Sequence, residues 1–158
     1  NVVLPYKSIF SNENCEIYEY KLFNKTDYKK KYKIVKECPF CNLNSKVEIM
    51  SESATAIAFL DGYPVSKGHT LIIPKRHVAD YFDLTMHEQR ALWLLVNRCK
   101  KILTEKFNPD GFNVGININK AAGQSIFHVH IHLIPRYKGD VKEPKGGVRG
   151  VIPNKQKY

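Results

Sequence analysis

The sequence predicts an α+β domain in which one long helix separates two pairs of strands of an antiparallel sheet. Four short apolar segments, at residues 54–60, 69–74, 112–118 and 126–134, have the length and the bounding turn residues of strands. One longer segment, residues 86–106, repeats its apolar residues at helical spacing. The order of two strands, one helix and two strands is typical of the α+β class.

The first strand pair is bounded by clear turn signals. Residues 54–60 are followed by the turn Asp61-Gly62-Tyr63-Pro64, and residues 69–74 read as a buried strand that ends at Pro74. The sequence therefore places a short hairpin-like connection between the first two predicted strands.

The helix has start and stop signals at both ends. Thr85 and Glu88 form a capping box, in which each side chain satisfies a free backbone amide of the other residue. The run Asn108-Pro109-Asp110-Gly111 ends the helix. Between them, six apolar residues share one face and predict an amphipathic helix that covers the sheet: Leu92, Leu95, Val96, Cys99, Ile102 and Leu103.

The second strand pair follows, with a turn at residues 119–123 between residues 112–118 and 126–134, and Pro135 ends the last strand. The final 23 residues show no clear periodicity.

Composition is that of a globular domain. The chain has 158 residues, of which 43% are hydrophobic and 25% are charged. No apolar run approaches the ~20 residues of a membrane span, and no signal segment opens the chain, so we expect no membrane contact. Four irregularly spaced cysteines do not make a secreted disulfide scaffold. We therefore expect a cytoplasmic protein.

The net charge of +10 comes from the two ends of the chain. Residues 1–36 carry 8 basic and 4 acidic groups, residues 37–135 carry 10 and 9, and residues 136–158 carry 7 and 2. Such an excess is typical of proteins that bind nucleic acid or polyphosphate, although solvated basic ends without a partner would look the same. We expect residues 1–36 to be a partly ordered extension and residues 138–158 to be a basic C-terminal segment.

Three histidines, His128, His130 and His132, alternate with apolar residues. On a strand they would share one face with ~7 Å between successive Cα atoms, and the apolar residues would pack under the helix from the other face. Rings spread in this way are poorly placed to bind one zinc ion together. A solvent-facing strand is the alternative. We interpret the row as catalytic, because imidazole attacks phosphorus at neutral pH and forms a covalent phosphohistidine.

Cys38-Pro39-Phe40-Cys41 is a C-x-x-C motif, whose spacing allows two thiolates to bind one tetrahedral ion. A thioredoxin-like redox pair has the same spacing but belongs in a βαβ pattern, which this sequence does not show. Free thiols and a disulfide remain alternatives.

The residues Gly123-Gln124-Ser125, ahead of the histidine row, offer an amide, a hydroxyl and backbone N–H groups to hold phosphate oxygens. Together with Leu60-Asp61, residues 68–74 and the histidine row, they resemble the motif blocks of the histidine triad (HIT) superfamily of nucleotide hydrolases and transferases. The resemblance covers residues 37–137. It implies a HIT-like fold with a five-stranded antiparallel sheet, usually in a homodimer, and assigns catalysis to this stretch.

The resemblance also implies roles for individual residues. His130 matches the nucleophile that attacks the α-phosphorus of a nucleotide, and His132 matches the triad member that contacts the phosphate and the leaving group. The substrate-contacting positions are Asp61 for the ribose hydroxyls, Asn117, Gln124 and Ser125 around the phosphate, and His69 as a support for the catalytic ring. Without the resemblance, Asp61 and Asn117 would be turn residues and His69 a core histidine.

Zinc-bearing relatives in this superfamily use positions that match His77 and His128 beside the C-x-x-C pair. The resemblance thus implies a closed, structural Cys2His2 zinc site of Cys38, Cys41, His77 and His128. His128 belongs to the triad as well, but as a zinc ligand it is not a free general base. No catalytic metal is required.

The implied function is a nucleotide hydrolase that cleaves at the α-phosphate of a dinucleoside polyphosphate or nucleoside phosphoramidate, through a nucleotidyl-histidine. Transferase branches carry Gln at the third triad position, so His132 favours hydrolysis over a nucleotidyltransferase or phosphorylase. A nucleotide- or nucleic-acid-binding module with vestigial hydrolysis is the remaining alternative, supported by the basic ends. Nucleic acid is a less favoured partner than a small nucleotide.

Overall fold

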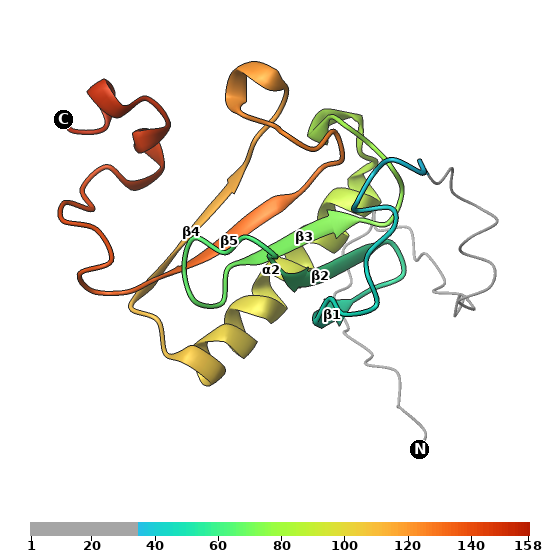
Figure 1. Cartoon of the computed structure of the whole chain (residues 1–158), viewed down its shortest axis with the longest axis horizontal. Helices are drawn as coiled ribbons and strands as arrows, with labels where there is room; N and C mark the ends of the chain where they lie inside the picture. The colour runs from blue at the N-terminus through green and yellow to red at the C-terminus, as the bar shows by residue number, and fades with distance from the viewer. Residues whose placement is uncertain (1–34) are drawn as a thin grey trace, which may run out of the picture.

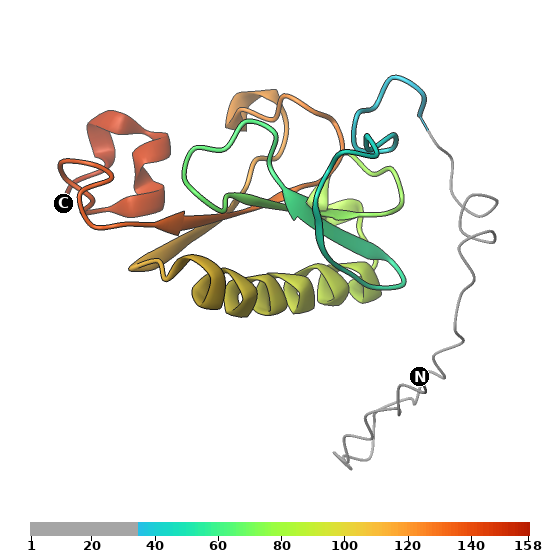
Figure 2. The same cartoon turned by 60° about the horizontal axis from the view of Figure 1, so that its bottom comes forward.

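The computed structural model describes residues 35–158, so the predictions for residues 1–34 lie outside the described residues. The centre is one five-stranded antiparallel sheet in the order β1-β2-β3-β5-β4 (Figure 1). The strands are β1 (Ile49–Glu52), β2 (Ala56–Leu60), β3 (Thr70–Pro74), β4 (Gly111–Ile116) and β5 (Ile131–Arg136). One long helix, α2 (Met86–Phe107), lies along one face of the sheet (Figure 2). The predicted α+β class and the five-stranded sheet are confirmed.

Helix α2 begins and ends as its sequence indicates. The Thr85 hydroxyl accepts a hydrogen bond from the Glu88 backbone N–H at 3.2 Å, and the Glu88 carboxylate accepts one from the Thr85 backbone N–H at 2.9 Å. The helix ends at Asn108, which takes a left-handed conformation with φ 44°. The predicted capping box is therefore confirmed, and the predicted end at residue 106 was one residue short.

The main core lies between α2 and the sheet. Val129, Ile131 and Leu133 are buried against the helix residues, as the alternating pattern predicted. The helix contributes six buried apolar residues to this core, namely Ala91, Leu92, Leu95, Val96, Cys99 and Leu103. Cys99 is therefore a core residue.

The opposite face of the sheet, which we call the open face, carries the polar residues of β5. Burial along β5 alternates, so that Ile131, Leu133 and Pro135 point to α2, whereas His132 and Arg136 point to the open face. Over β2 and β3 this face has a small core of its own, Phe59, Leu71 and Ile73, covered by residues that include Phe40, Leu43 and Val47. The open face is thus covered on the β2–β3 side.

Three strand predictions needed correction. The last strand begins at Ile131 rather than at residue 126, because the Val129 N–H bonds to the Val78 carbonyl at 2.7 Å and the His128 N–H to the Ile126 carbonyl at 2.8 Å. It also continues through Pro135, which lies opposite Phe112 in the sheet. β4 covers residues 111–116 rather than 112–118, and the edge strand β1 was not predicted.

The last residues form two short 3-10 helices, η3 (Gly147–Val151) and η4 (Pro153–Lys155), in a stretch that shows no periodic pattern. They pack against one another beyond the sheet (Figure 1). Two further 3-10 helices, η1 (Tyr81–Asp83) and η2 (Lys120–Ala122), lie in the loops before α2 and after β4. Within the described part of the chain, no helix is long and apolar enough to cross a membrane.

Candidate active site and metal centre

His130 is almost fully buried and its ring is held in one tautomer. Its Nδ1 lies 2.8 Å from the backbone carbonyl oxygen of His128. A carbonyl only accepts hydrogen bonds, so Nδ1 carries the ring proton and Nε2 keeps its lone pair. In the neutral ring this arrangement leaves the lone pair on Nε2.

His132 stands beside His130, with 4.9 Å between the ring centroids. Its Nδ1 lies 3.0 Å from Nε2 of His69, and Nδ1 of His69 lies 3.2 Å from the Asp61 carboxylate. The four side chains form a continuous row from the turn after β2 to β5. The structure thus brings together four of the predicted site residues.

Burial lowers the pKa of two rings of this row, His132 and His69. Burial first, and then the neighbouring rings of His130 and His69, lower the pKa of His132 to about 4. Burial also lowers the pKa of His69, although the Asp61 carboxylate acts in the opposite direction. His132 is accordingly neutral at pH 7, with one proton to place on its two ring nitrogens.

The position of that proton depends on His69. If Nδ1 of His69 is protonated, it donates to Asp61, and Nε2 accepts from Nδ1 of His132. If Nε2 of His69 is protonated, it donates to His132, and Nδ1 can accept from the Val65 N–H at 3.3 Å. In the second arrangement Nε2 of His132 carries a proton that it can donate to a substrate. Nε2 of His132 can therefore act either as a hydrogen-bond donor or as a hydrogen-bond acceptor.

The loop between β4 and β5 holds the remaining predicted residues. Gln124 is buried, with its amide oxygen 2.7 Å from the Asn119 N–H and its amide nitrogen 2.8 Å from the Ala79 carbonyl and 3.2 Å from the Ile126 carbonyl. Its side chain thus ties the loop to the chain ahead of α2. Ser125, next to it, is exposed.

Asn117 lies at the same end of the strand pair as the histidines. It follows Ile116, which pairs with Ile131, the residue directly after His130. The backbone pairing therefore supports the placement of Asn117 close to His130.

A second cluster joins the C-x-x-C motif to two histidines. The ligand atoms of Cys38, Cys41, His77 and His128 all lie within 4.8 Å of one another. Both cysteines are free thiols rather than a disulfide. The structure thus brings together all four predicted metal ligands.

The distances in this cluster fit a tetrahedral ion. Cys41 Sγ lies 3.3 Å from His77 Nδ1 and 3.7 Å from His128 Nδ1, and Cys38 Sγ lies 3.5 Å from His128 Nδ1. Zinc bound at ~2.3 Å to sulfur and ~2.0 Å to nitrogen would separate neighbouring ligand atoms by roughly 3.5 Å. Four protein ligands would leave no open coordination position.

His128 takes part in both clusters. Its Nε2 lies 2.8 Å from the Pro74 carbonyl, so Nε2 carries the proton and Nδ1 offers its lone pair toward the cysteines. Burial lowers the pKa of the ring to about 4, which keeps it in the neutral form that binds metals. Its backbone carbonyl meanwhile holds the His130 ring. The ring of His128 is thus used at the metal cluster, as the sequence predicted.

Phe40 is a site residue that the sequence reasoning missed. Its ring makes edge contacts with His128 and His130, with centroids 5.9 Å and 5.3 Å apart. It packs between the metal cluster and the nucleophile. Its place inside the C-x-x-C motif was the available signal, because a residue between two ligands of one ion must lie close to that ion.

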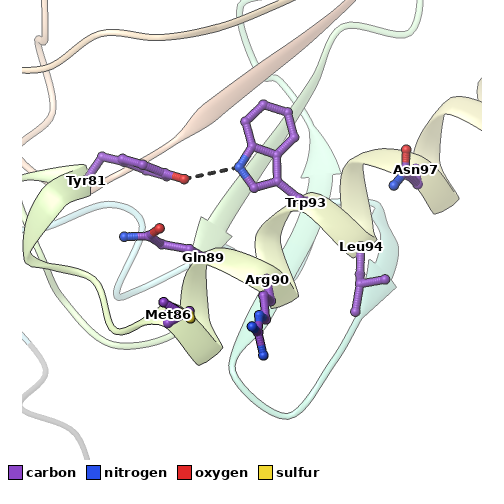
Figure 3. Close-up of a pocket in the computed structure, with 7 residues that line it drawn as sticks. All are labelled: Tyr81, Met86, Gln89, Arg90, Trp93, Leu94 and Asn97. Atoms are coloured by element: carbon purple, nitrogen blue, oxygen red, sulfur yellow. Dashed lines mark hydrogen bonds between the residues drawn. The ribbon is translucent and has the colours of Figure 1, made fainter. Parts of the chain in front are cut away.

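A surface pocket lies elsewhere, on α2, which is on the other side of the sheet from the open face. It has a volume of about 540 Å³ and is lined by Tyr81 and residues of α2 that include Met86, Trp93 and Leu94 (Figure 3). The Trp93 indole N–H donates to the Tyr81 hydroxyl at 3.1 Å. None of the predicted site residues lines this pocket. The position of the pocket therefore does not indicate the histidine site.

Sequence comparison gives a match to the HIT domain over residues 42–139. "Protein hit" of Bacillus subtilis is 38% identical over 110 residues, which are 65% of this chain and 74% of that protein. The bis(5'-adenosyl)-triphosphatase of Dictyostelium discoideum is 43% identical over 93 residues, 59% of this chain and 62% of that protein. An AP-4-A phosphorylase of Mycobacterium tuberculosis is 33% identical over 93 residues, 58% of this chain and 48% of that protein.

Solved structures agree with these matches. A HIT family protein from Bacillus anthracis has a TM-score of 0.63 at 39% identity, covering 66% of this chain and 77% of its own. A zinc-bound histidine triad protein from Mycobacterium smegmatis has a TM-score of 0.62 at 32% identity, covering 68% of this chain and 80% of its own. On its sequence, its fold and its row of three histidines, this chain belongs to the HIT domain family.

Proposed function

We propose that the chain is a nucleotide hydrolase that cleaves at the α-phosphate of a dinucleoside polyphosphate or nucleoside phosphoramidate. The observation that carries the proposal is the His130 ring, whose Nδ1–H is held by the His128 carbonyl so that Nε2 is free to attack. The relative named bis(5'-adenosyl)-triphosphatase supports a dinucleotide substrate. We assign catalysis to residues 37–137 and treat residues 138–158 as a separate basic segment.

In the first step, the lone pair of His130 Nε2 forms a bond to the α-phosphorus while the bond from phosphorus to the leaving group breaks. Nε2 of His132 donates its proton to the departing oxygen or nitrogen, which requires the arrangement in which Nε2 of His69 is protonated and donates to Nδ1 of His132. In the second step, water attacks the same phosphorus, the phosphorus–nitrogen bond breaks, and His132 takes up a proton from the water. The products are a nucleoside monophosphate and the protonated leaving group.

The other predicted residues serve this reaction by holding the substrate. Ser125 and the backbone of its loop bind the phosphate oxygens. Gln124 was predicted to contact the phosphate as well, but its side-chain amide is bonded to Asn119, Ala79 and Ile126, so we assign it the role of fixing the shape of that loop. Asn117 contacts the phosphate from the end of β4. Asp61, whose Oδ1 accepts the Tyr63 N–H at 2.9 Å, uses its remaining lone pairs for the ribose hydroxyls.

We also propose that Cys38, Cys41, His77 and His128 hold a structural zinc ion. The ligand distances and the zinc-bound relative from Mycobacterium smegmatis support this site. Zinc would crosslink the turn at residues 38–41, the loop after β3 and the residue that positions His130. It supplies no group to the reaction.

Replacing His130 by Ala tests the nucleophile. We expect turnover of diadenosine triphosphate to be lost, and the covalent nucleotide seen by mass spectrometry of wild-type protein quenched at alkaline pH to be missing. The matched control is His87→Ala, because His87 is an exposed residue on α2. Retained turnover in pure His130→Ala protein would overturn the assignment.

Phosphorolysis is the second candidate function, because one relative is named AP-4-A phosphorylase. In that case inorganic phosphate would replace water in the second step and give a nucleoside diphosphate. Turnover measured in water enriched in a heavy oxygen isotope, with and without added phosphate, distinguishes hydrolysis from phosphorolysis. Hydrolysis predicts heavy oxygen in the monophosphate product and no dependence on phosphate.

We propose further that two copies form a homodimer. β4 is an edge strand in the described sheet, and its residues Phe112, Val114 and Ile116 are only partly buried. On α2, Trp93 and Leu94 are 42% and 56% exposed. If two copies paired along their β4 edges and also covered Trp93 and Leu94, neither the strand edge nor these apolar side chains would remain exposed to solvent.

A further inference from the structure

The last residues of the chain fold into a closed basic loop, which we call the C-terminal clasp (residues 144–158). Arg149 closes it by donating to the carbonyls of Lys155 and Gln156 at 3.0 Å and 3.3 Å. Gln156 donates back to the Lys145 carbonyl at 3.2 Å. The closure is tight at Gly146, where φ is 89° and a side-chain carbon would collide with the Gln156 carbonyl oxygen. The clasp is therefore a defined structure rather than a loose tail.

The clasp is strongly cationic. It contains Lys145, Arg149, Lys155 and Lys157 and no acidic residue, and all four side chains are exposed. Lys145 and Arg149 both lie 5.3 Å from the centre of the Tyr158 ring. Because Arg149 has five N–H groups and its bonds to the Lys155 and Gln156 carbonyls use two of them, donors remain for an anion.

The acidic groups nearest in sequence are already engaged. Asp140 pairs with Arg136 at 2.7 Å, and the Glu143 carboxylate accepts the Lys145 N–H at 3.2 Å. The positive charge of the clasp is thus not offset by an acidic residue of its own.

The clasp lies at the β4 side of the open face, which also carries the histidines. The Cβ position of Gly147 would be 3.5 Å from the side-chain nitrogen of Asn113 on β4. Asn113 precedes Gly115 by two residues, or ~7 Å along the strand. Gly115 is the pairing partner of His132. The stretch of open face between His132 and the clasp, which we call the path, therefore runs over Gly115 and past the Asn113 side chain, which accepts a hydrogen bond from Arg136.

This path is clear of side chains at Gly115. A side-chain carbon built there would meet nothing within 4 Å. The glycine is therefore not required by packing, and it leaves space directly beside the ring that faces the leaving group.

We propose that the C-terminal clasp binds the phosphates of the leaving group, with Gly115 keeping the path to it open. This inference rests on the proposed function and narrows it to dinucleoside polyphosphates, because their leaving group is a polyanion. A phosphoramidate releases an uncharged or cationic amine, for which four exposed cations offer no attraction.

The test compares kcat/KM for diadenosine triphosphate and adenosine 5′-phosphoramidate, which share the α-phosphate and the nucleophile. Arg149→Gln should lower kcat/KM about tenfold for the first substrate and leave the second unchanged, since one charge-assisted bond to phosphate is lost. Lys155→Gln, which keeps the closing bonds of the clasp, should act in the same direction. Gly115→Val should also lower kcat/KM for diadenosine triphosphate alone, because valine would fill the path and is well suited to a β-strand.

Lys101→Gln is the matched control, because Lys101 is an exposed cation on α2 and the net charge changes equally. It should affect neither substrate. Equal losses for both substrates in Arg149→Gln would show that the clasp merely supports the fold, and no loss in either clasp variant would show that its cations are only solvated. Either result overturns the proposal.

A binding measurement keeps this inference separate from the proposed function. If the wild type turns over neither substrate, the hydrolase assignment fails, but the clasp can still be tested by calorimetry with inorganic tripolyphosphate. Arg149→Gln should then bind several-fold more weakly than wild type and Lys101→Gln equally well. The proposal would be wrong if the wild type did not bind tripolyphosphate, or if the wild type and both variants bound it equally well. It would also be wrong if Arg149→Gln weakened binding only to a single-stranded oligonucleotide.

Discussion

Asp61 contacts two different parts of the site. Its Oδ2 lies 3.2 Å from His69 Nδ1, and His69 in turn contacts His132. Its proposed partner on the substrate is the ribose. A carboxylate in this position influences which ring nitrogen of His69 carries a proton, and it also offers hydrogen-bond acceptors to a hydroxyl. The two roles can be separated by removing the ribose hydroxyl instead of the carboxylate.

We expect Asp61→Asn to lower kcat/KM about tenfold or more with a ribonucleotide substrate, and by a smaller but clear factor with its 2′-deoxy analogue. The loss of kcat/KM that remains with the 2′-deoxy analogue would measure the effect of Asp61 on His132 through His69. Steady-state kinetics with both substrates gives the numbers, and Asp83→Asn, at an exposed position, is the control. A loss seen only with the ribonucleotide would contradict a role through His69.

Individual site residues were predictable where a motif or the family resemblance identifies them. The C-x-x-C motif and the family resemblance together gave all four members of the metal cluster, and the alternation of residues 128–133 gave the face that packs under α2. The bonds of Gln124 to Asn119 and Ala79 were not predictable, because they depend on how two distant loops meet. The proton position on His130 likewise depends on a backbone carbonyl that no sequence pattern reveals.

Among the elements, the start of α2 has the strongest electrostatic support. Arg76, just after β3, donates two hydrogen bonds of 2.8 Å to the Glu88 carboxylate, which also caps the helix. These bonds with Arg76, and next those with Thr85, lower the pKa of Glu88 to about 2 against the cost of burial. The ion pair links the strand that precedes His77 to the helix that covers the sheet.

Glu88→Gln should lower the free energy of unfolding by about 3 kcal/mol at pH 7, the value that corresponds to a pKa shift from 4.5 to about 2. The folded pKa lies below the unfolded one, so this stability is fully present above pH 4.5 and is lost as pH falls toward 2. Urea unfolding at several pH values measures it.

The exposed Glu105, in the last turns of the same helix, gives the control variant Glu105→Gln, which should leave stability unchanged. The difference between wild type and Glu88→Gln should shrink steadily below pH 4.5. A pH-independent difference would mean that packing, rather than the charge, accounts for the effect.

Element boundaries were predictable where side chains set them. The capping box fixed the start of α2, and the Asn-Pro-Asp-Gly run fixed its end to within a residue. The start of β5 was predicted five residues too early, because alternation cannot tell which carbonyl an amide will choose, and Val129 bonds to Val78 outside the sheet. β1 was missed because a four-residue, half-exposed edge strand has no strong pattern.

Across the whole molecule, the proposed zinc ion would join three separate stretches of chain. The turn at residues 38–41 covers part of the open face through Phe40, and in the described part of the chain the turn itself lies outside any helix or strand. Metal binding to the folded state alone adds directly to its stability. Zinc should therefore contribute to global stability although it lies at one end of the sheet.

We expect elemental analysis to find one zinc ion per chain, and a strong chelator to lower Tm by about 10 °C or more. Cys41→Ser should start near the lower Tm and show no further change with chelator. Zinc content near zero in protein purified without chelator, or an unchanged Tm after complete removal, would contradict a structural zinc site.

The proposed dimer can be tested by sedimentation. Wild type should sediment at twice the chain mass of 18.2 kDa, and Leu94→Glu should shift the protein to the monomer, because the charge would be buried against a second copy. Lys100→Glu, at an exposed position on the same helix, is the control. A monomeric wild type, or a dimer unaffected by Leu94→Glu, would show the α2 surface to be free.

His128 has a consequence for how this sequence can change over time. Its ring faces the cysteines, but the group that orients the nucleophile is its backbone carbonyl, and every amino acid provides that carbonyl. Selection for metal binding and selection for catalysis therefore act on different atoms of one residue. A lineage that lost the cysteine pair would lose the metal-binding use of this imidazole but would still keep the backbone carbonyl that orients His130.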